Sequence, residues 1–244
     1  MKTIVAYHRP GDLDEAVALL ERTDVTSTVI AGGTALNTVS LPEDTEVVDI
    51  QDAVAAGVAR HGDRVVYGAM TRLADVIKAD ETPPLLAELA RREGPNTLRN
   101  ASTIGGTVAE GDADSELLAG LLVHDATVQL SGGESVPLAG LFSDWSLLDR
   151  AVIVAVSVEI GGETASARTG RTPADTSIVA AAGRIVSGGT TVALTGVATT
   201  PVLVDPADLS SLRPPADFRG TSEYRSELAE VLVKRVVSQL GGAS

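Results

Sequence analysis

The triplet Gly-Gly-Thr occurs twice in this chain, at 32–34 and at 105–107, and it restricts the backbone more than any other sequence feature. The first triplet directly follows a strand-like apolar run that ends at Ile30. Adjacent glycines let the chain turn sharply and expose backbone N–H groups, which can bind a diphosphate without any Lys or Arg. Neither triplet belongs to a Walker A motif or to the spaced glycine fingerprint of Rossmann folds.

Each loop taken alone is more often a tight turn, because glycine is the usual turn residue. Two such loops in one domain favour a dinucleotide, which has one diphosphate and two ends to hold. The second loop is followed by the acidic residues Glu110, Asp112, Asp114 and Glu116, and a carboxylate here can accept hydrogen bonds from ribose hydroxyls. The residues therefore leave two interpretations open: a pair of turns beside a solvated acidic face, or a dinucleotide site.

Hydrophobic periodicity divides the chain into short strands and helices, which indicates an α+β fold. Strands are expected at 3–7, 26–30, 46–50, 64–69, 127–130, 151–160 and 190–197. Helices are expected at 13–20, 72–79, 85–92, 117–124 and 222–240, and the first two are expected to have Asp12 and Thr71 as N-caps. The remaining segments predict a loop or irregular strand at 100–108, a junction at 143–150 and a linker at 201–215.

The formal net charge of −14 argues against nucleic-acid binding and against attraction to anionic membranes. The chain has no cysteine, so it cannot ligate an iron–sulfur cluster by itself. The histidines His8, His61 and His124 lack metal-ligand spacing. We expect a cytoplasmic protein, since the N-terminus has no signal-peptide core and no apolar run reaches the ~18 residues of a transmembrane helix.

The sequence around both loops resembles one known family. Residues 30–36 read Ile-Ala-Gly-Gly-Thr-Ala-Leu, and residues 97–107 read Thr-Leu-Arg-Asn-Ala-Ser-Thr-Ile-Gly-Gly-Thr. These segments resemble the two FAD-binding signatures of the medium subunit of molybdenum hydroxylases, the group of xanthine dehydrogenase, carbon monoxide dehydrogenase and aldehyde oxidase. The resemblance is supported along nearly the whole chain by 7–10, 48–50, 67–71, 118–126, 171–175, 193–201 and 220–225.

This resemblance implies a fold and a site. It implies a PCMH-type FAD-binding domain over residues 1–145, with subdomains of about 1–55 and 56–145, and a small α+β C-terminal domain with antiparallel strands over 146–244. Thr107 stands where the family usually has Asn, and Glu116 stands where it usually has Asp. No residue is expected to be catalytic or to bind a metal. The residues expected to bind FAD are Ala31, Gly32, Gly33, Thr34, Ala35, Leu36, Thr103, Ile104, Gly105, Gly106, Thr107 and Glu116.

The resemblance also implies a function. Non-covalently bound FAD would take electrons from [2Fe–2S] clusters on a small partner subunit and pass them to an external acceptor, while a large subunit holds the molybdenum cofactor. A dimer of heterotrimers is expected. The missing cysteines agree with clusters that reside on another chain. Two alternatives stay open: a stand-alone FAD-dependent oxidoreductase of the same superfamily, and a scaffold subunit that no longer binds flavin.

Overall fold

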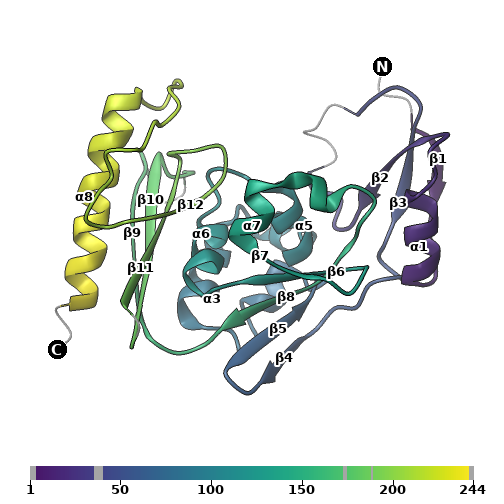
Figure 1. Ribbon diagram of the computed structural model, residues 1–244, viewed down its shortest axis with the longest axis horizontal. Helices are drawn as coiled ribbons and strands as arrows, with labels where there is room; N and C mark the ends of the chain where they lie inside the picture. The colour runs from purple at the N-terminus through teal and green to yellow at the C-terminus, as the bar shows by residue number, and fades with distance from the viewer. Residues whose placement is uncertain (1–3, 36–40, 173–174, 188, 242–244) are drawn as a thin grey trace.

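The described residues, 4–35, 41–172, 175–187 and 189–241, form three β-sheets that follow one another along the computed structural model (Figure 1). The N-terminal sheet is parallel, and the middle and C-terminal sheets are antiparallel. Helices lie beside each sheet. The α+β fold predicted from the sequence is confirmed.

The N-terminal unit is a small sheet with one helix against it. Its elements are β1 (Ile4–His8), α1 (Leu13–Leu20), β2 (Thr26–Ile30) and β3 (Thr45–Asp49), with strand order β1-β3-β2. The Asp12 carboxylate accepts a hydrogen bond from the Glu15 N–H at 2.9 Å, so the predicted N-cap of α1 is confirmed. β2 forms an edge of this sheet, and the first glycine loop begins where β2 ends.

The middle unit is an antiparallel sheet surrounded by short helices. Its strands are β4 (Val58–His61), β5 (Arg64–Gly68), β6 (Thr127–Leu130), β7 (Ser135–Pro137) and β8 (Ile153–Glu159), in the order β4-β5-β8-β6-β7. Its helices are α2 (Leu73–Val76), α3 (Pro84–Arg92), α4 (Asn96–Arg99), α5 (Ile104–Glu110), α6 (Glu116–Val123), α7 (Leu138–Ser143) and the 3₁₀ turn η1 (Trp145–Leu148). All residues of α6 are buried, because α6 packs against α3 and against the C-terminal sheet.

The C-terminal unit is a sheet covered by one long helix. Its elements are β9 (Glu163–Thr169), β10 (Val179–Val186), β11 (Gly189–Thr195), β12 (Val202–Val204) and α8 (Ser222–Gly241), with strand order β12-β11-β10-β9. A Cβ built on Gly183 would lie 2.4 Å from Val236 Cγ1, so glycine at this position lets α8 approach β10 closely. The buried face of α8 closes the core of this unit.

Residues 100–108 differ from the sequence-based expectation, since they contain a helix rather than a loop or irregular strand. The Thr103 hydroxyl accepts a hydrogen bond from the Gly106 N–H at 3.1 Å and caps α5, while Ile104 and Val108 are buried in the core. Thr71 is not the N-cap of a helix. Its hydroxyl bonds both the N–H and the C=O of Gly57 at 2.9 Å, and α2 begins without a side-chain cap.

The expected domain boundary at 145–146 falls inside the middle unit. β8 lies beyond that point, yet it pairs with β5 and β6 in the centre of the middle sheet. We therefore propose that the C-terminal domain begins after Glu159. The expected linker at 201–215 contributes β12, which pairs with β11. None of the helices built by described residues has the length and apolar character needed to cross a bilayer.

Candidate functional site

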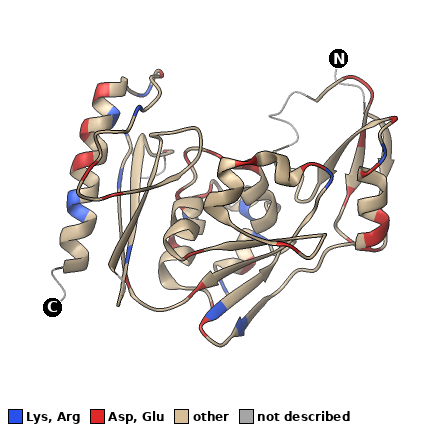
Figure 2. Ribbon diagram, viewed as in Figure 1, with Lys and Arg blue, Asp and Glu red and all other residues tan. Residues whose placement is uncertain are grey.

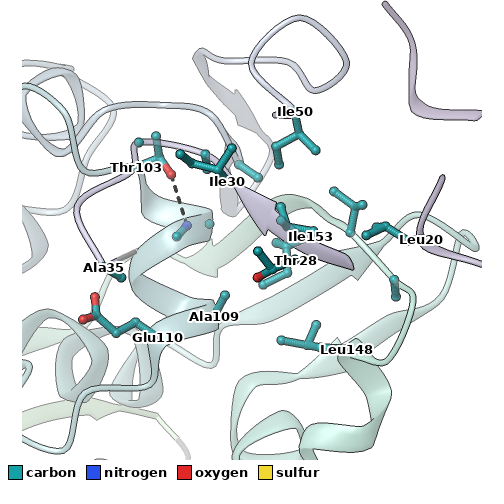
Figure 3. Close-up of a pocket in the computed structure, with 18 of the residues that line it drawn as sticks. Leu20, Thr28, Ile30, Ala35, Ile50, Thr103, Ala109, Glu110, Leu148 and Ile153 are labelled. Carbon is teal, nitrogen blue, oxygen red and sulfur yellow. Dashed lines mark hydrogen bonds between the residues drawn. The ribbon is translucent and has the colours of Figure 1, made fainter. Parts of the chain in front are cut away.

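A cavity of about 510 Å³ lies where the N-terminal and middle units meet (Figure 3). One part of its lining comes from β2 and the loop after it, residues 27–35. A second part comes from Thr103 and from α5, and a third from the segment Leu148–Ile153. Its volume is within the ~300–1,000 Å³ of typical ligand sites. Both glycine loops singled out in the sequence therefore reach the same cavity.

The two loops touch each other directly. A Cβ built on Gly32 would lie only 2.0 Å from the carbonyl oxygen of Ala101, so no other residue fits at position 32 without moving the second loop. Beside this contact, the Ser102 hydroxyl donates a hydrogen bond to the Thr34 hydroxyl at 3.0 Å. Gly33 has a left-handed backbone with φ of 73°, which glycine adopts without strain.

The two loops differ in their free hydrogen-bond donors. In the second loop the N–H groups of Ile104 and Gly105 donate to the carbonyls of Thr71 and Ala69 at 2.9 and 3.0 Å. The next two N–H groups of α5 donate to Thr103. In the first loop, by contrast, the N–H groups of residues 32–34 donate no hydrogen bond within the described part of the chain. The first loop therefore offers the donors that an anion needs.

The structure brings eight of the twelve predicted site residues to the cavity. These are Ala31, Gly32, Gly33, Thr34, Ala35, Thr103, Gly105 and Gly106. Ile104 lies instead in the hydrophobic core, and the buried Thr107 hydroxyl donates to the Thr103 carbonyl at 3.1 Å. Leu36 lies outside the described residues.

Glu116, the remaining predicted residue, does not line the cavity. Its side chain is 6% exposed, and its two oxygens form ion pairs with Arg92 Nη1 at 2.8 Å and with Arg168 Nε at 2.7 Å. These contacts connect α6 to α3 and to β9. Next to them, burial raises the pKa of Glu93 to about 7, although its carboxylate accepts hydrogen bonds from Ser115 and Leu117 at 2.9 Å. Glu116 therefore joins elements of the middle and C-terminal units.

The ionisable side chains that do line the cavity are Glu110, Asp149 and Arg150. Burial and the neighbouring Asp112 raise the pKa of Glu110. Arg150 has a left-handed backbone with φ of 61°, a conformation that usually costs a non-glycine residue on the order of 1–3 kcal/mol. Asp149 and Arg150 were not predicted as site residues, because the sequence at 143–150 indicates only a junction. Glu110 stood in the acidic stretch, but nothing in the sequence set it apart from Glu116.

No cluster of His, Cys, Asp and Glu suited to a metal ion occurs among the described residues. His124 is buried at the end of α6, where its Nδ1 lies 2.7 Å from the Glu159 carbonyl oxygen. Since a carbonyl only accepts, Nδ1 carries the proton. Burial lowers the pKa of His124 to about 4 and keeps the ring neutral. This histidine thus has a structural position away from the cavity.

Comparison with known proteins gives consistent similarities. Residues 3–158 match the family described as the FAD binding domain in molybdopterin dehydrogenase. The carbon monoxide dehydrogenase medium chain of Afipia carboxidovorans is 27% identical over 276 residues, covering 96% of this chain and 95% of the relative. The glyceraldehyde dehydrogenase medium chain of Sulfolobus acidocaldarius is 25% identical, covering 96% and 98%. A chain of the carbon monoxide dehydrogenase of Hydrogenophaga pseudoflava superposes with a TM-score of 0.87 at 27% identity, covering 99% of both chains.

Proposed function

This chain belongs to the family of FAD-binding domains of molybdopterin dehydrogenases, and from that membership we propose that it is the flavin-carrying, electron-transferring subunit of a molybdenum-containing hydroxylase complex. The resemblance noted in the sequence is confirmed by the family match and by the medium-chain relatives. The chain is thus an oxidoreductase subunit. Its electron route, its partners and its cytoplasmic location are the parts that we propose.

The observation that carries the proposal is the cavity formed jointly by the two glycine loops. Its donors fit a diphosphate, because the N–H groups of residues 32–34 have no other partner among the described residues. Its shape fits as well. Gly106 lines the cavity without a side chain, so a ligand can approach its backbone, and a Cβ there would lie 3.0 Å from Thr103 Oγ1. We propose that the cavity residues of both loops hold FAD without a covalent bond.

FAD bound here would supply the exchange of electrons, and the protein would bind and orient it. The chain has no cysteine, so [2Fe–2S] clusters in the same complex must be held by another chain. The relatives named medium chains imply larger and smaller companions. We therefore propose a molybdopterin-binding large subunit and a [2Fe–2S] small subunit as partners, assembled as a dimer of heterotrimers. The electron acceptor of the flavin would be external to the complex.

The flavin content of the purified full chain tests this proposal. We expect about one FAD per chain, released into the supernatant when trichloroacetic acid precipitates the protein, because the chain has no cysteine and no histidine is among the described residues that line the cavity. The measurement is the absorption spectrum of supernatant and pellet. Flavin that stays in the pellet would contradict non-covalent binding. A chain that neither contains nor takes up flavin would instead identify a scaffold subunit.

A further inference from the structure

Arg150 is the one Lys or Arg among the described residues that line the cavity. It lies between η1 and β8 and is exposed. Within the described part of the chain, its guanidinium forms no hydrogen bond and no ion pair. Its φ of 61° lies in the left-handed region that favours glycine, so this arginine stands at a position where its backbone is strained.

A positive charge at the cavity would strengthen the binding of a diphosphate beyond what the backbone N–H groups provide. Glu110 and Asp149 both line the cavity, and the whole chain has a net charge of −14, with acidic residues in all three units (Figure 2). The N–H groups of residues 32–34 supply only partial positive charges. Of the described lining residues, only Arg150 carries a full positive charge that can offset the two carboxylates.

We propose that Arg150 pairs with the diphosphate of the bound dinucleotide and thereby makes the cavity prefer FAD to a flavin without phosphate. The planar guanidinium can donate two parallel hydrogen bonds to phosphate oxygens, which a point charge cannot do. A ligand would give this guanidinium the partner that it lacks among the described residues. The inference rests on the proposed function and names the cation of the same site.

The variant Arg150→Gly separates the role of the side chain from folding. Glycine suits a φ of 61°, so the melting temperature of the flavin-free full chain should stay equal or rise. FAD and riboflavin are titrated into flavin-free protein, and flavin fluorescence is measured. We expect the Kd for FAD to increase roughly tenfold to a hundredfold, as for loss of a charged hydrogen bond, and the Kd for riboflavin to stay unchanged. Arg150→Lys, which keeps the charge, should give an intermediate Kd for FAD.

Two control variants lie outside the cavity lining. Asp44→Gly relieves a left-handed backbone with φ of 59°, and Arg60→Ala removes an exposed positive charge from β4. Neither should change the Kd for FAD. Wild-type affinity for FAD in Arg150→Gly overturns the inference and leaves the proposed function intact. Equal weakening of FAD and riboflavin also overturns it, since the residue would then shape the cavity instead. Wild-type protein that binds no FAD overturns the proposed function and the inference together.

Discussion

The four glycines of the two loops have different tasks, although the sequence presents them as two equal pairs. Gly32 and Gly105 permit close packing, because a Cβ would lie 2.0 Å from Ala101 O and 2.6 Å from the Ala69 Cβ. Gly33 provides a left-handed turn, and Gly106 lines the cavity, where a Cβ would lie 3.0 Å from Thr103 Oγ1. Substitutions at these positions should therefore separate packing from ligand binding.

We predict that Gly32→Ala and Gly106→Ala both weaken FAD binding but only Gly32→Ala destabilises the chain. At position 32 the new methyl must push the loops apart, at a cost of roughly 1–3 kcal/mol of unfolding free energy. At position 106, inside α5, alanine is a better helix former, and its Cβ would lie 3.0 Å from Thr103 Oγ1, a side-chain hydroxyl that can shift by the few tenths of an ångström required. Urea unfolding of the flavin-free protein and FAD titration are the two measurements.

The control for this pair is Gly140→Ala in α7, where the new Cβ would be 3.5 Å from Val136 Cγ1, an ordinary contact. It should leave FAD affinity unchanged. If Gly106→Ala bound FAD as tightly as the wild type, the second loop would have no close contact with the cofactor.

His124 should make the folded chain sensitive to acid. The folded pKa of about 4 lies below the unfolded value of ~6.5, so its contribution to stability is complete above pH 6.5 and is lost as the pH falls toward 4. The loss should be on the order of 3 kcal/mol. His124→Asn retains an N–H donor for the Glu159 carbonyl but does not titrate, so its free energy of unfolding should fall less over this range.

The pH series is measured by urea unfolding, with the exposed residue His61 changed to Asn as the control. The control should follow the wild-type pH profile, because His61 remains in water in both states. Identical profiles for wild type and His124→Asn would show that His124 is not the acid-sensitive group.

At the scale of elements, α8 is fixed to the C-terminal sheet by one buried arginine. Arg225 is 1% exposed, and its Nη1 donates to the carbonyls of Ile178 and Gly196 at 2.8 and 2.7 Å. Its Nη2 pairs with Asp217 at 2.7 Å, which lowers the pKa of that carboxyl. One side chain therefore connects the start of α8 to both central strands.

We predict that Arg225→Met lowers the free energy of unfolding by about 3–5 kcal/mol, since removing one partner leaves the buried carbonyls unpaired. Arg225→Lys keeps the charge but loses the planar fork, so its loss should be smaller. Urea unfolding measures both. Arg235→Met on the exposed part of the same helix should change stability by less than ~0.5 kcal/mol. A similar small change in Arg225→Met would contradict the anchoring role.

The sequence predicted the elements whose own residues show a clear hydrophobic periodicity. The strand at 64–68, the capped helix α1 and the closing helix α8 are confirmed. It missed elements that depend on distant partners. Neither β9 nor β10 was expected, because Glu163–Thr169 is mostly polar and Val179–Val186 is rich in alanine, so neither alternates clearly.

In the site, too, the features encoded by local sequence were predicted and those that depend on distant partners were not. The glycine loops were recognisable because local backbone chemistry makes them so. Glu116 was predicted to bind the cofactor from the family resemblance, and its ion pairs with Arg92 on α3 and Arg168 on β9 could not be predicted because the tertiary fold sets them. α5 was missed because two adjacent glycines lower helix propensity, and burial of Ile104 and Val108 outweighs that cost.

At the scale of the whole molecule, the hydrophobic core is shared between the units. The cluster around the middle sheet includes Ala16 of α1 as well as Ala182 and Ala193 of the C-terminal sheet. A further link is polar: Arg219 pairs with Asp114 at 2.6 Å. The chain should therefore present one rigid surface to its partners, with the cavity in a fixed relation to that surface.

We predict that the single purified chain does not oxidise an alcohol or aldehyde, whereas a complex formed by co-expression with molybdenum and iron–sulfur subunits does. Substrate should bleach the flavin absorbance in the complex and leave it unchanged in the isolated chain. Stopped-flow absorbance under anaerobic conditions is the measurement. Steady turnover by the chain alone would favour the stand-alone oxidoreductase.

The contact between the two glycine loops also has a consequence for timing. Thr34 and Ser102, which touch at the cavity, are 68 residues apart in the sequence, and contacts of such long range form late when a chain folds. The cavity is thus assembled only after both units have found their places. Flavin that binds this cavity should therefore stabilise the folded chain by mass action and leave its folding rate unchanged.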